Sequence, residues 1–367
     1  MNRKQLKAVL GIGIISVTSV CNVAMCEAGV LYPVKQTTVN YDTDGTENNR
    51  NEISIKSYAL PGGYVSVYEG ANMLSYKTEN GTGSMGYDEN GNIRYVTNTT
   101  IQENGDYTSS QFSFGDFKNA SVSFSHVTEK DEYGKTVANE VTSYRSSSAE
   151  IGNMSGFSED TQAFQYSSEY DDQGLCLTRE TYQDGGSEPS SIAKYEYQDG
   201  KTLCNTYGSD GSLLYFSMSD SESGEIYETA TYTDDVKVYD RSIEFAQEPT
   251  EAAELADLYQ GIWTIDLEGT GMEDWFGSFS TIDEGFANGQ ALYVNNQTGT
   301  VQYFMEEEIL DAAINPDDPS QICVWDTSNG NGAGDFSAAQ MILTYDKETD
   351  TFNVSADGTE SFTMRRF

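Results

Sequence analysis

The chain has 367 residues, a length that allows two domains, and carries 20 Lys and Arg against 59 Asp and Glu, a formal net charge of −39. This excess of negative charge excludes most nucleic-acid recognition, because a protein must neutralise phosphates rather than repel them. The 16 Phe, 3 Trp and 25 Tyr predict packed structure, since disordered acidic chains lack aromatic residues. A single histidine leaves little room for metal–histidine or histidine-base chemistry.

Residues 1–28 have the pattern of a secretory signal peptide. Three basic side chains open the chain: Arg3, Lys4 and Lys7. The apolar run 8–20 that follows is too short to span a bilayer, and small side chains at Cys26 and Ala28 suit cleavage after residue 28. The sequence therefore predicts a secreted protein with no further membrane span. The alternative is a lipid anchor at the cell surface, on Cys21 or Cys26.

Three cysteines follow the predicted cleavage site, too few for a disulfide framework. Cys176 and Cys204 fall on neighbouring predicted strands and could pair, which would leave Cys323 free. The alternative is that all three are unpaired small apolar side chains.

Residues 52–247 predict an antiparallel β-meander domain, preceded by a loosely ordered segment over 29–51. Large side chains fall on every second position in stretches such as 64–68, 122–126 and 164–166, with Ser, Thr, Gln or Glu between them. That period indicates strands with one packed face and one face in water. No stretch in this part shows a sustained helical period.

The turns between these strands repeat a motif. Tyr87-Asp88-Glu89-Asn90-Gly91 returns as 170–174 and 207–211, and in shortened form as 182–185 and 197–200. A tyrosine ends each strand, Asp or Asn bonds its own backbone, and Gly supplies the positive φ that reverses the chain. The motif resembles the tyrosine–aspartate (YD, Rhs-type) β-hairpin repeats of bacterial surface and toxin proteins. The resemblance implies a curled hairpin-repeat sheet used as wrapping or scaffold, and no catalytic residues.

Residues 248–260 break the rhythm and predict a short helical linker, with Thr250 as the N-cap of a helix over 251–258. A smaller β-rich, barrel-like domain is predicted over 261–367, with a helical turn over 306–313. Its opening Gly261-Ile262-Trp263 and its hairpins resemble small lipocalin-like domains of exported bacterial proteins. The 105 residues between Arg241 and Lys347 contain no Lys or Arg, so a ligand held there would be cationic or apolar.

Few residues suggest chemistry. His126 lies on a strand and would need a nucleophile or carboxylate brought to it before it could act as a base. The acidic pair in 273–275 stands beside a tryptophan and is the best local candidate for glycoside hydrolysis. Asp42, Asp44 and Glu47 surround a glycine turn and are candidate calcium ligands, with a plain polar turn as the alternative.

Together these features predict an all-β chain: an antiparallel meander, then a smaller β-rich domain, with one or two short helices. The expected function is a secreted or cell-surface, non-enzymatic binding or scaffold protein that contacts glycan or protein. Two alternatives remain at this stage. One is a lipocalin-like protein that holds a small ligand, and the other is a carbohydrate-active enzyme with paired carboxylates. Calcium is the only cofactor that the sequence suggests.

Overall fold

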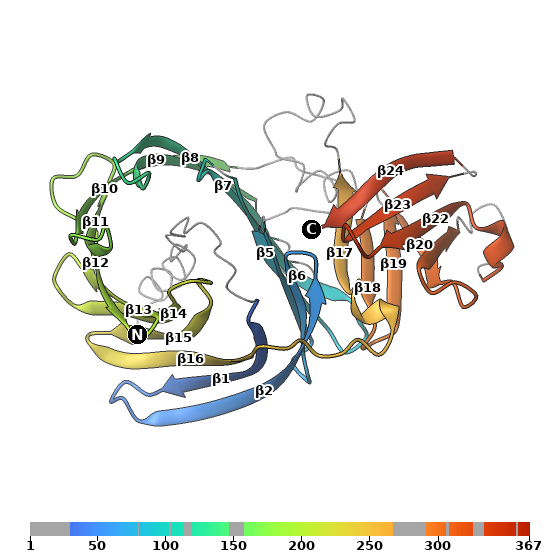
Figure 1. Cartoon of the computed structure of the whole chain (residues 1–367), viewed down its shortest axis with the longest axis horizontal. Helices are drawn as coiled ribbons and strands as arrows, with labels where there is room; N and C mark the ends of the chain where they lie inside the picture. The colour runs from blue at the N-terminus through green and yellow to red at the C-terminus, as the bar shows by residue number, and fades with distance from the viewer. Residues whose placement is uncertain are drawn as a thin grey trace.

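The chain folds into two closed antiparallel β-barrels, a large one and a small one, which lie side by side (Figure 1). The computed structural model describes residues 30–79, 81–102, 104–113, 119–146, 158–266, 291–305, 308–325, 334–356 and 359–367. The predicted signal peptide and both cysteines proposed for lipidation lie outside these residues.

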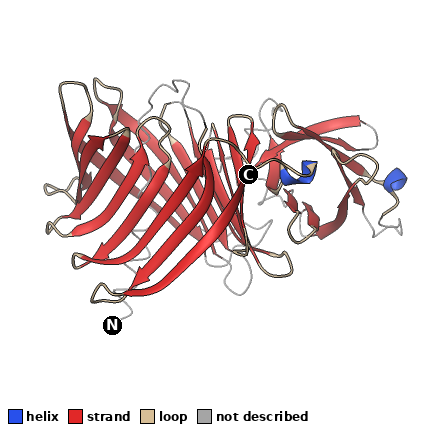
Figure 2. Ribbon diagram, turned by 60° about the horizontal axis from the view of Figure 1, so that its bottom comes forward, coloured by secondary structure: helices blue, strands red, loops and turns tan. Residues whose placement is uncertain are grey.

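The large barrel has sixteen strands, each hydrogen-bonded to the strand before it and the strand after it in the sequence. They run obliquely around the barrel (Figure 2). In chain order they are β1 (Tyr32–Tyr41), β2 (Glu47–Leu60), β3 (Gly63–Tyr68), β4 (Met73–Thr78), β5 (Gly81–Tyr87), β6 (Ile93–Ile101), β7 (Tyr107–Ser113), β8 (Asn119–Lys130), β9 (Thr136–Ser146), β10 (Ser158–Tyr170), β11 (Cys176–Gln183), β12 (Ser191–Gln198), β13 (Lys201–Gly208), β14 (Leu213–Asp220), β15 (Ile226–Thr233) and β16 (Val236–Ala246).

The predicted fold class, an open curled meander with short helices, is wrong. The first and last strands of the series pair, with Tyr32 opposite Ala246 and Asn40 opposite Tyr239, so the sheet closes on itself. Closure removes the two unpaired edges that an open sheet would expose. Residues 29–51, expected to be loosely ordered, supply β1 and the start of β2, and they are therefore part of the wall.

The repeated turns have the chemistry that their sequence predicts. The carboxylate of Asp88 accepts hydrogen bonds from the amides of Asn90 and Asn92, and Gly91 has a φ of +82°. Asp171 and Gly174 repeat the arrangement, with a φ of +80° at the glycine. A side chain in place of Gly91 would also collide with Thr300 of the small barrel. This turn therefore both reverses the chain and packs between the barrels.

The predicted helix over 251–258 is also wrong. The linker contains a single 3-10 turn, η1 (Leu255–Asp257), capped by Glu254 rather than by Thr250. Thr250 instead bonds to the edge of β2: its amide donates to the carbonyl of Ser57, and its hydroxyl accepts from the Ser57 amide. Tertiary pairing with the barrel outweighs the local helical signal of an alanine- and glutamate-rich stretch.

The small barrel has eight strands, again in sequential order and closed by pairing of the first with the last. The predicted helical turn over 306–313 is wrong, because its residues from Glu308 onward belong to a strand. A second 3-10 turn, η4 (Phe336–Ala338), precedes the sixth strand. The strands are β17 (Gly261–Asp266), β18 (Ala291–Asn295), β19 (Thr300–Met305), β20 (Glu308–Ile314), β21 (Gln321–Trp325), β22 (Met341–Asp346), β23 (Thr351–Ala356) and β24 (Thr359–Arg366).

An aromatic cluster fills one end of the small barrel. The Trp263 ring lies 4.8 Å from Phe352, and Tyr259 lies 5.0 Å from Tyr345. Further along the inside are apolar side chains with almost no exposed surface: Leu292, Ile322, Val324, Leu343, Val354 and Met364. Eight strands enclose an interior just wide enough for side chains to fill, and here they do so.

A buried ion pair closes this end. Arg366 donates to both carboxylate oxygens of Asp350, at 2.8 and 2.9 Å, and its side chain is only 3% exposed. It also donates to the carbonyls of Leu258 and Gln260 in the linker, and its guanidinium lies 4.2 Å above the Trp263 ring. One side chain thus joins the last strand, the first strand and the linker.

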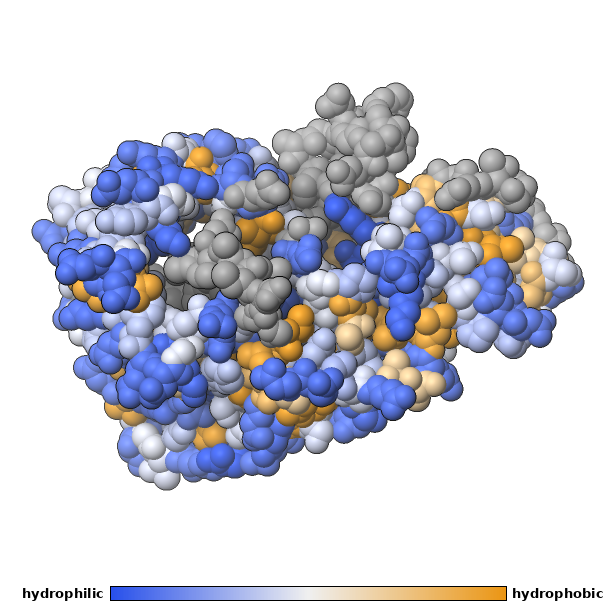
Figure 3. Space-filling view, in the orientation of Figure 1, coloured by the Kyte–Doolittle hydropathy of each residue, from blue (hydrophilic) through white to orange (hydrophobic). Residues whose placement is uncertain are grey.

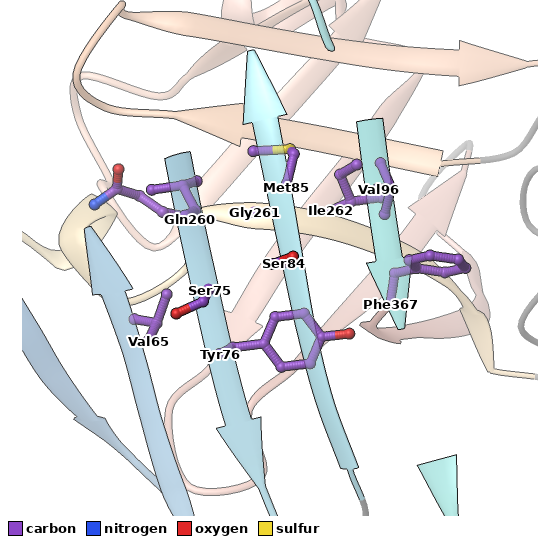
Figure 4. Close-up of a pocket in the computed structure, with 11 residues that line it drawn as sticks. Val65, Ser75, Tyr76, Ser84, Met85, Val96, Gln260, Gly261, Ile262 and Phe367 are labelled. Atoms are coloured by element: carbon purple, nitrogen blue, oxygen red, sulfur yellow. The ribbon is translucent and has the colours of Figure 1, made fainter. Parts of the chain in front are cut away.

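The two barrels share a continuous apolar contact. Figure 4 shows Val65, Met85 and Val96 of the large barrel beside Ile262 and Phe367 of the small one. They surround a pocket of about 10 Å³, room for one water molecule at most. The pocket is a small packing gap in the interface between the barrels, too small for a ligand.

Candidate functional site

The wall of the large barrel has two distinct faces. Val65, Met85 and Val96 turn outward, since they contact the small barrel, and successive residues of a strand alternate between faces. Residues directly opposite each other on paired strands point to the same side of the sheet. The cross-strand register therefore assigns each paired residue outside a β-bulge, here called a regular position, to an outer or an inner wall. The inner wall, defined as the face opposite these three residues, is the candidate functional site.

Hydroxyl groups cross the inner wall in a continuous row. Each member stands directly opposite the next on neighbouring strands: Ser57, Ser66, Ser75, Ser84 and Thr97. The Oγ atoms of Ser57 and Ser66 lie 2.7 Å apart, as do those of Ser84 and Thr97. A second row of hydroxyls runs through Thr99, Ser109, Ser123 and Ser143. The two rows therefore present neutral hydroxyl groups to the interior.

Tyrosines face the same interior on either side of the hydroxyl rows. The register turns ten of them inward: Tyr64, Tyr68, Tyr95, Tyr107, Tyr166, Tyr170, Tyr195, Tyr197, Tyr215 and Tyr239. Tyr195, Tyr215 and Tyr239 are half-buried and so retain accessible ring surface. Aromatic faces beside hydroxyl groups suit ligands that have both apolar ring faces and polar edges.

Cations also point inward. Arg179 lies 3.9 Å from the centre of the Tyr166 ring and donates to the carbonyl of Thr136. Arg241 on β16 stands between Thr229 and Thr38 of the neighbouring strands. Neither arginine forms an ion pair with any carboxylate that the structure describes. Among the described residues at regular positions of the inner wall, the acidic one is Asp160 on β10.

The turn between β14 and β15 contacts the inner wall on distant strands of the barrel. Glu225, at the end of the β14–β15 turn, accepts a hydrogen bond of 2.6 Å from Lys77 on β4 and lies 3.3 Å from the Tyr64 hydroxyl on β3. Three strands separate β15 from β3 around the barrel. The turn is therefore tied to a distant part of the wall, and it narrows the interior at this level.

The outer wall is different in character. On β10 and β12 the outward residues are exposed, and they include Glu159, Glu169, Lys194 and Glu196. Outward cations on β1 and β2 are paired with carboxylates: Lys35 with Glu52 and Glu244, Arg50 with Glu47, and Lys56 with Glu69. The view in Figure 3 shows hydrophilic residues over most of the large barrel, with apolar ones toward the small barrel.

Most tyrosines of the wall are harder to ionise than free tyrosine. Burial raises the pKa of Tyr64, Tyr107 and Tyr166 above the ordinary value near 10. The hydrogen bond from Tyr41 to Asp240, 2.5 Å long, raises the pKa of Tyr41 to about 12. In each case the folded structure favours the neutral phenol.

This preference predicts a loss of stability at alkaline pH. A tyrosine whose pKa is raised by folding contributes stability that is complete below its unfolded pKa near 10 and is lost as pH rises through the folded value. We expect the tyrosine contribution to the free energy of unfolding to be constant from neutral pH to about pH 9 and to fall above about pH 10. Urea unfolding across this range, with tyrosinate absorbance followed in parallel, tests the expectation. Tyrosines that all titrate near pH 10 in the folded protein would contradict it.

The structure gives His126 a partner but no catalytic setting. Its Nδ1 lies 3.2 Å from Asp106, and its side chain is 70% exposed on the outer wall. Burial would raise the pKa of Asp106, yet hydrogen bonds from the Val127 amide, His126 and Asn104 together lower it. A nucleophile for a histidine base is absent from the hydrogen-bond partners that the structure describes for His126.

The candidate calcium ligands do not converge. Asp42 accepts from Asn48, Asp44 accepts from the Thr46 amide, and Glu47 binds Arg50 through both carboxylate oxygens. Within the described part of the chain, no group of three or more His, Cys, Asp or Glu side chains could hold a metal ion. The calcium site stays a prediction. The acidic pair of 273–275 lies outside the described residues.

The proposed disulfide is not formed. Cys176 is on β11 and Cys204 on β13, so β12 lies between them, and Cys176, Cys204 and Cys323 form no disulfide. Burial raises the pKa of Cys204 and of Cys323, which favours the protonated thiol at both positions.

The inner wall was not recognised from the sequence, although a signal for it exists. The serines of the first row, Ser57, Ser66, Ser75 and Ser84, recur at a constant interval along the chain. Such an interval places equivalent positions of successive short hairpins opposite one another. The cations Arg179 and Arg241 carry no comparable signal, because only closure of the barrel brings their strands around one interior.

No helix in the described part of the chain is long and apolar enough to cross a membrane. No family model and no curated protein matches the chain. Among solved structures, the chain is similar to a porin-like protein from Bacteroides uniformis, at 11% identity over 90% of this chain and 95% of that one. The TM-score is 0.18, so this similarity supports no statement about function.

Proposed function

We propose that this chain is a secreted or cell-surface binding protein without catalytic activity, and that it binds glycan against the inner wall of its large barrel. The observation that carries the proposal is the contrast between the two walls. The inner wall combines rows of hydroxyls with half-buried tyrosine rings, whereas the outer wall carries exposed charges on β10 and β12 and apolar side chains, Leu203, Phe216 and Met218, on β13 and β14. A sugar presents just such a combination of apolar ring faces and hydroxyl edges.

The size of the barrel supports an interior site. Side chains fill an eight-stranded barrel, whereas barrels of 16 to 18 strands leave a water-filled channel. The small barrel, with its tightly packed apolar interior, is therefore the less suitable of the two for a ligand. Glycoside hydrolysis would need two carboxylates about 5–10 Å apart. Among the described residues, Asp160 is the one carboxylate at a regular position of the inner wall, and Glu225, which reaches the wall from the β14–β15 turn, is held in an ion pair with Lys77.

The outer wall supports a barrel that works in water. A transmembrane barrel needs an outward apolar band, and a Lys or Arg facing lipid at the bilayer midplane costs about 2–4 kcal/mol. Lys194 lies in the middle of β12 and faces outward, with Glu196 beside it and Glu180 on the next strand. These charges fit a hydrated exterior.

Paired tyrosine variants test the proposal. Binding of the purified chain to a glycan panel would be compared for an inner double variant, Tyr195→Ala with Tyr215→Ala, and an outer one, Tyr182→Ala with Tyr207→Ala. All four residues are half-buried and lie on four neighbouring strands, β11–β14. We expect the inner variant to lose about tenfold or more in affinity, as truncated aromatic contacts do, and the outer variant to match the unmodified chain.

Two results would contradict the proposal. One is a panel of neutral and acidic glycans to which the folded chain does not bind. The other is equal loss of affinity in both double variants, which would place the contact away from the inner wall.

A further inference from the structure

The charges of the large barrel are distributed in an unexpected way. The chain as a whole carries −39, and the outward positions of β10–β12 and β16 are rich in acids such as Glu159, Glu180, Glu196 and Glu244. Inward positions instead carry Lys77, Arg145, Arg179 and Arg241. The interior is therefore the part of this acidic protein that accommodates negative charge best.

Among the residues that the structure describes, two of the inward cations have no carboxylate partner. Lys77 is held by Glu225, but Arg179 contacts an aromatic face and a carbonyl, and Arg241 stands between two threonines. Both arginines are half-buried. The outward cations Lys35, Arg50 and Lys56 each have a carboxylate partner, whereas outward Lys194 lies over the Tyr207 ring. In a chain with 59 acids, an arginine without one retains its capacity for an anionic ligand.

We infer that the inner wall binds an acidic saccharide, with Arg241 and Arg179 as the groups that receive its carboxylates; the inference rests on the proposed function. The planar guanidinium matches a carboxylate through two parallel hydrogen bonds. The tyrosines and hydroxyl rows that flank these arginines contact the neutral part of each sugar. The ligand class is a polymer with about one carboxylate per sugar, such as a uronic-acid chain.

The net charge of the protein narrows this class further. Its repulsion of a distant anion is screened beyond about 8–10 Å at physiological salt, so contacts inside the barrel decide binding. A polymer with dense negative charge, such as a nucleic acid or a heavily sulfated chain, would still be repelled by the acidic exterior wherever it lies outside the barrel. A chain with one carboxylate per sugar carries fewer charges per unit length than a double-stranded nucleic acid, so the same acidic exterior repels it less.

The test compares two probes that differ only in charge: an oligomer of galacturonic acid and the same oligomer with its carboxylates methyl-esterified. Calorimetric titration is expected to show the acid form binding about tenfold or more tightly than the ester, the size of a hydrogen bond to a charged group. Arg241→Gln should remove this preference and leave ester binding unchanged. Arg50→Gln, on the outer wall, should change neither affinity.

The outcomes separate the inference from the proposed function. If the ester binds as tightly as the acid, the acidic-ligand inference is overturned and a neutral glycan site remains. The same holds if Arg241→Gln weakens the binding of both probes equally. If neither probe binds, the inference is also overturned. The proposed function is tested separately, by binding of the chain to the glycan panel. Arg241→Lys is the control for misfolding. It keeps the positive charge, so it should retain most of the preference for the acid form.

Discussion

Replacing Arg366 by methionine is expected to lower the free energy of unfolding of the small barrel by about 3–5 kcal/mol. The substitution leaves Asp350 buried at 9% exposure without its cation, and the carbonyls of Leu258 and Gln260 without their donor. It also removes the guanidinium stacked on Trp263. Urea unfolding followed by tryptophan fluorescence measures the change, because this ring lies at the affected site.

An exposed ion pair provides the control. Arg50 and Glu47 form a comparable two-oxygen contact, but both side chains are more than 40% exposed. Arg50→Met should therefore leave the free energy of unfolding almost unchanged, because water screens an exposed pair. Asp350→Asn should resemble Arg366→Met, since it leaves the buried guanidinium without an anion. Equal and small effects of Arg366→Met and Arg50→Met would show that the buried pair does not join the linker to the barrel.

Gly63→Ala is expected to destabilise the large barrel by about 3 kcal/mol, the upper end of the range for overpacking. A Cβ at this position would lie 1.9 Å from the carbonyl oxygen of Lys77 on the neighbouring strand. That oxygen belongs to the backbone, so the strands β3 and β4 would have to part locally.

The control for this variant is Gly186→Ala, where the nearest atom would be 3.2 Å away and the residue is exposed. Its effect should stay within about 1 kcal/mol, as for other exposed positions. Hydrogen exchange of the β3 and β4 amides would locate the damage. Unchanged protection of these amides in Gly63→Ala would contradict the close backbone approach at this point.

The strands and their turns could be read from the sequence because both depend on neighbouring residues. Alternation in 64–68 and 122–126 predicts strands, and β3 and β8 lie there, although both faces of β3 are buried. Asp88 with Gly91 defines a turn within five residues. Closure could not be read in this way, since Tyr32 and Ala246 are joined only by long-range pairing. Residues 29–51 were predicted to be a loose segment, yet the part of it in β1 and at the start of β2 pairs within the barrel wall.

The same distinction applies to the site. Alternating tyrosines and small polar residues showed that each strand has two unlike faces, but not which one lines an interior. The tyrosine face was assigned to packing in a sheet, whereas several of its rings stay half-exposed inside a wide barrel. Arg179 and Arg241 are separated by sixty residues of chain and five strand-to-strand steps, so their shared surroundings follow from closure alone.

The most direct test of an interior glycan site is hydroxyl-radical footprinting of the chain with and without a bound glycan from the panel. An interior site predicts protection of Tyr195, Tyr215 and Tyr239, with Tyr182 and Tyr207 unchanged on the outer faces of β11 and β13. Protection of Tyr182 and Tyr207, with the three inward rings unaffected, would contradict it and place glycan binding on the exterior.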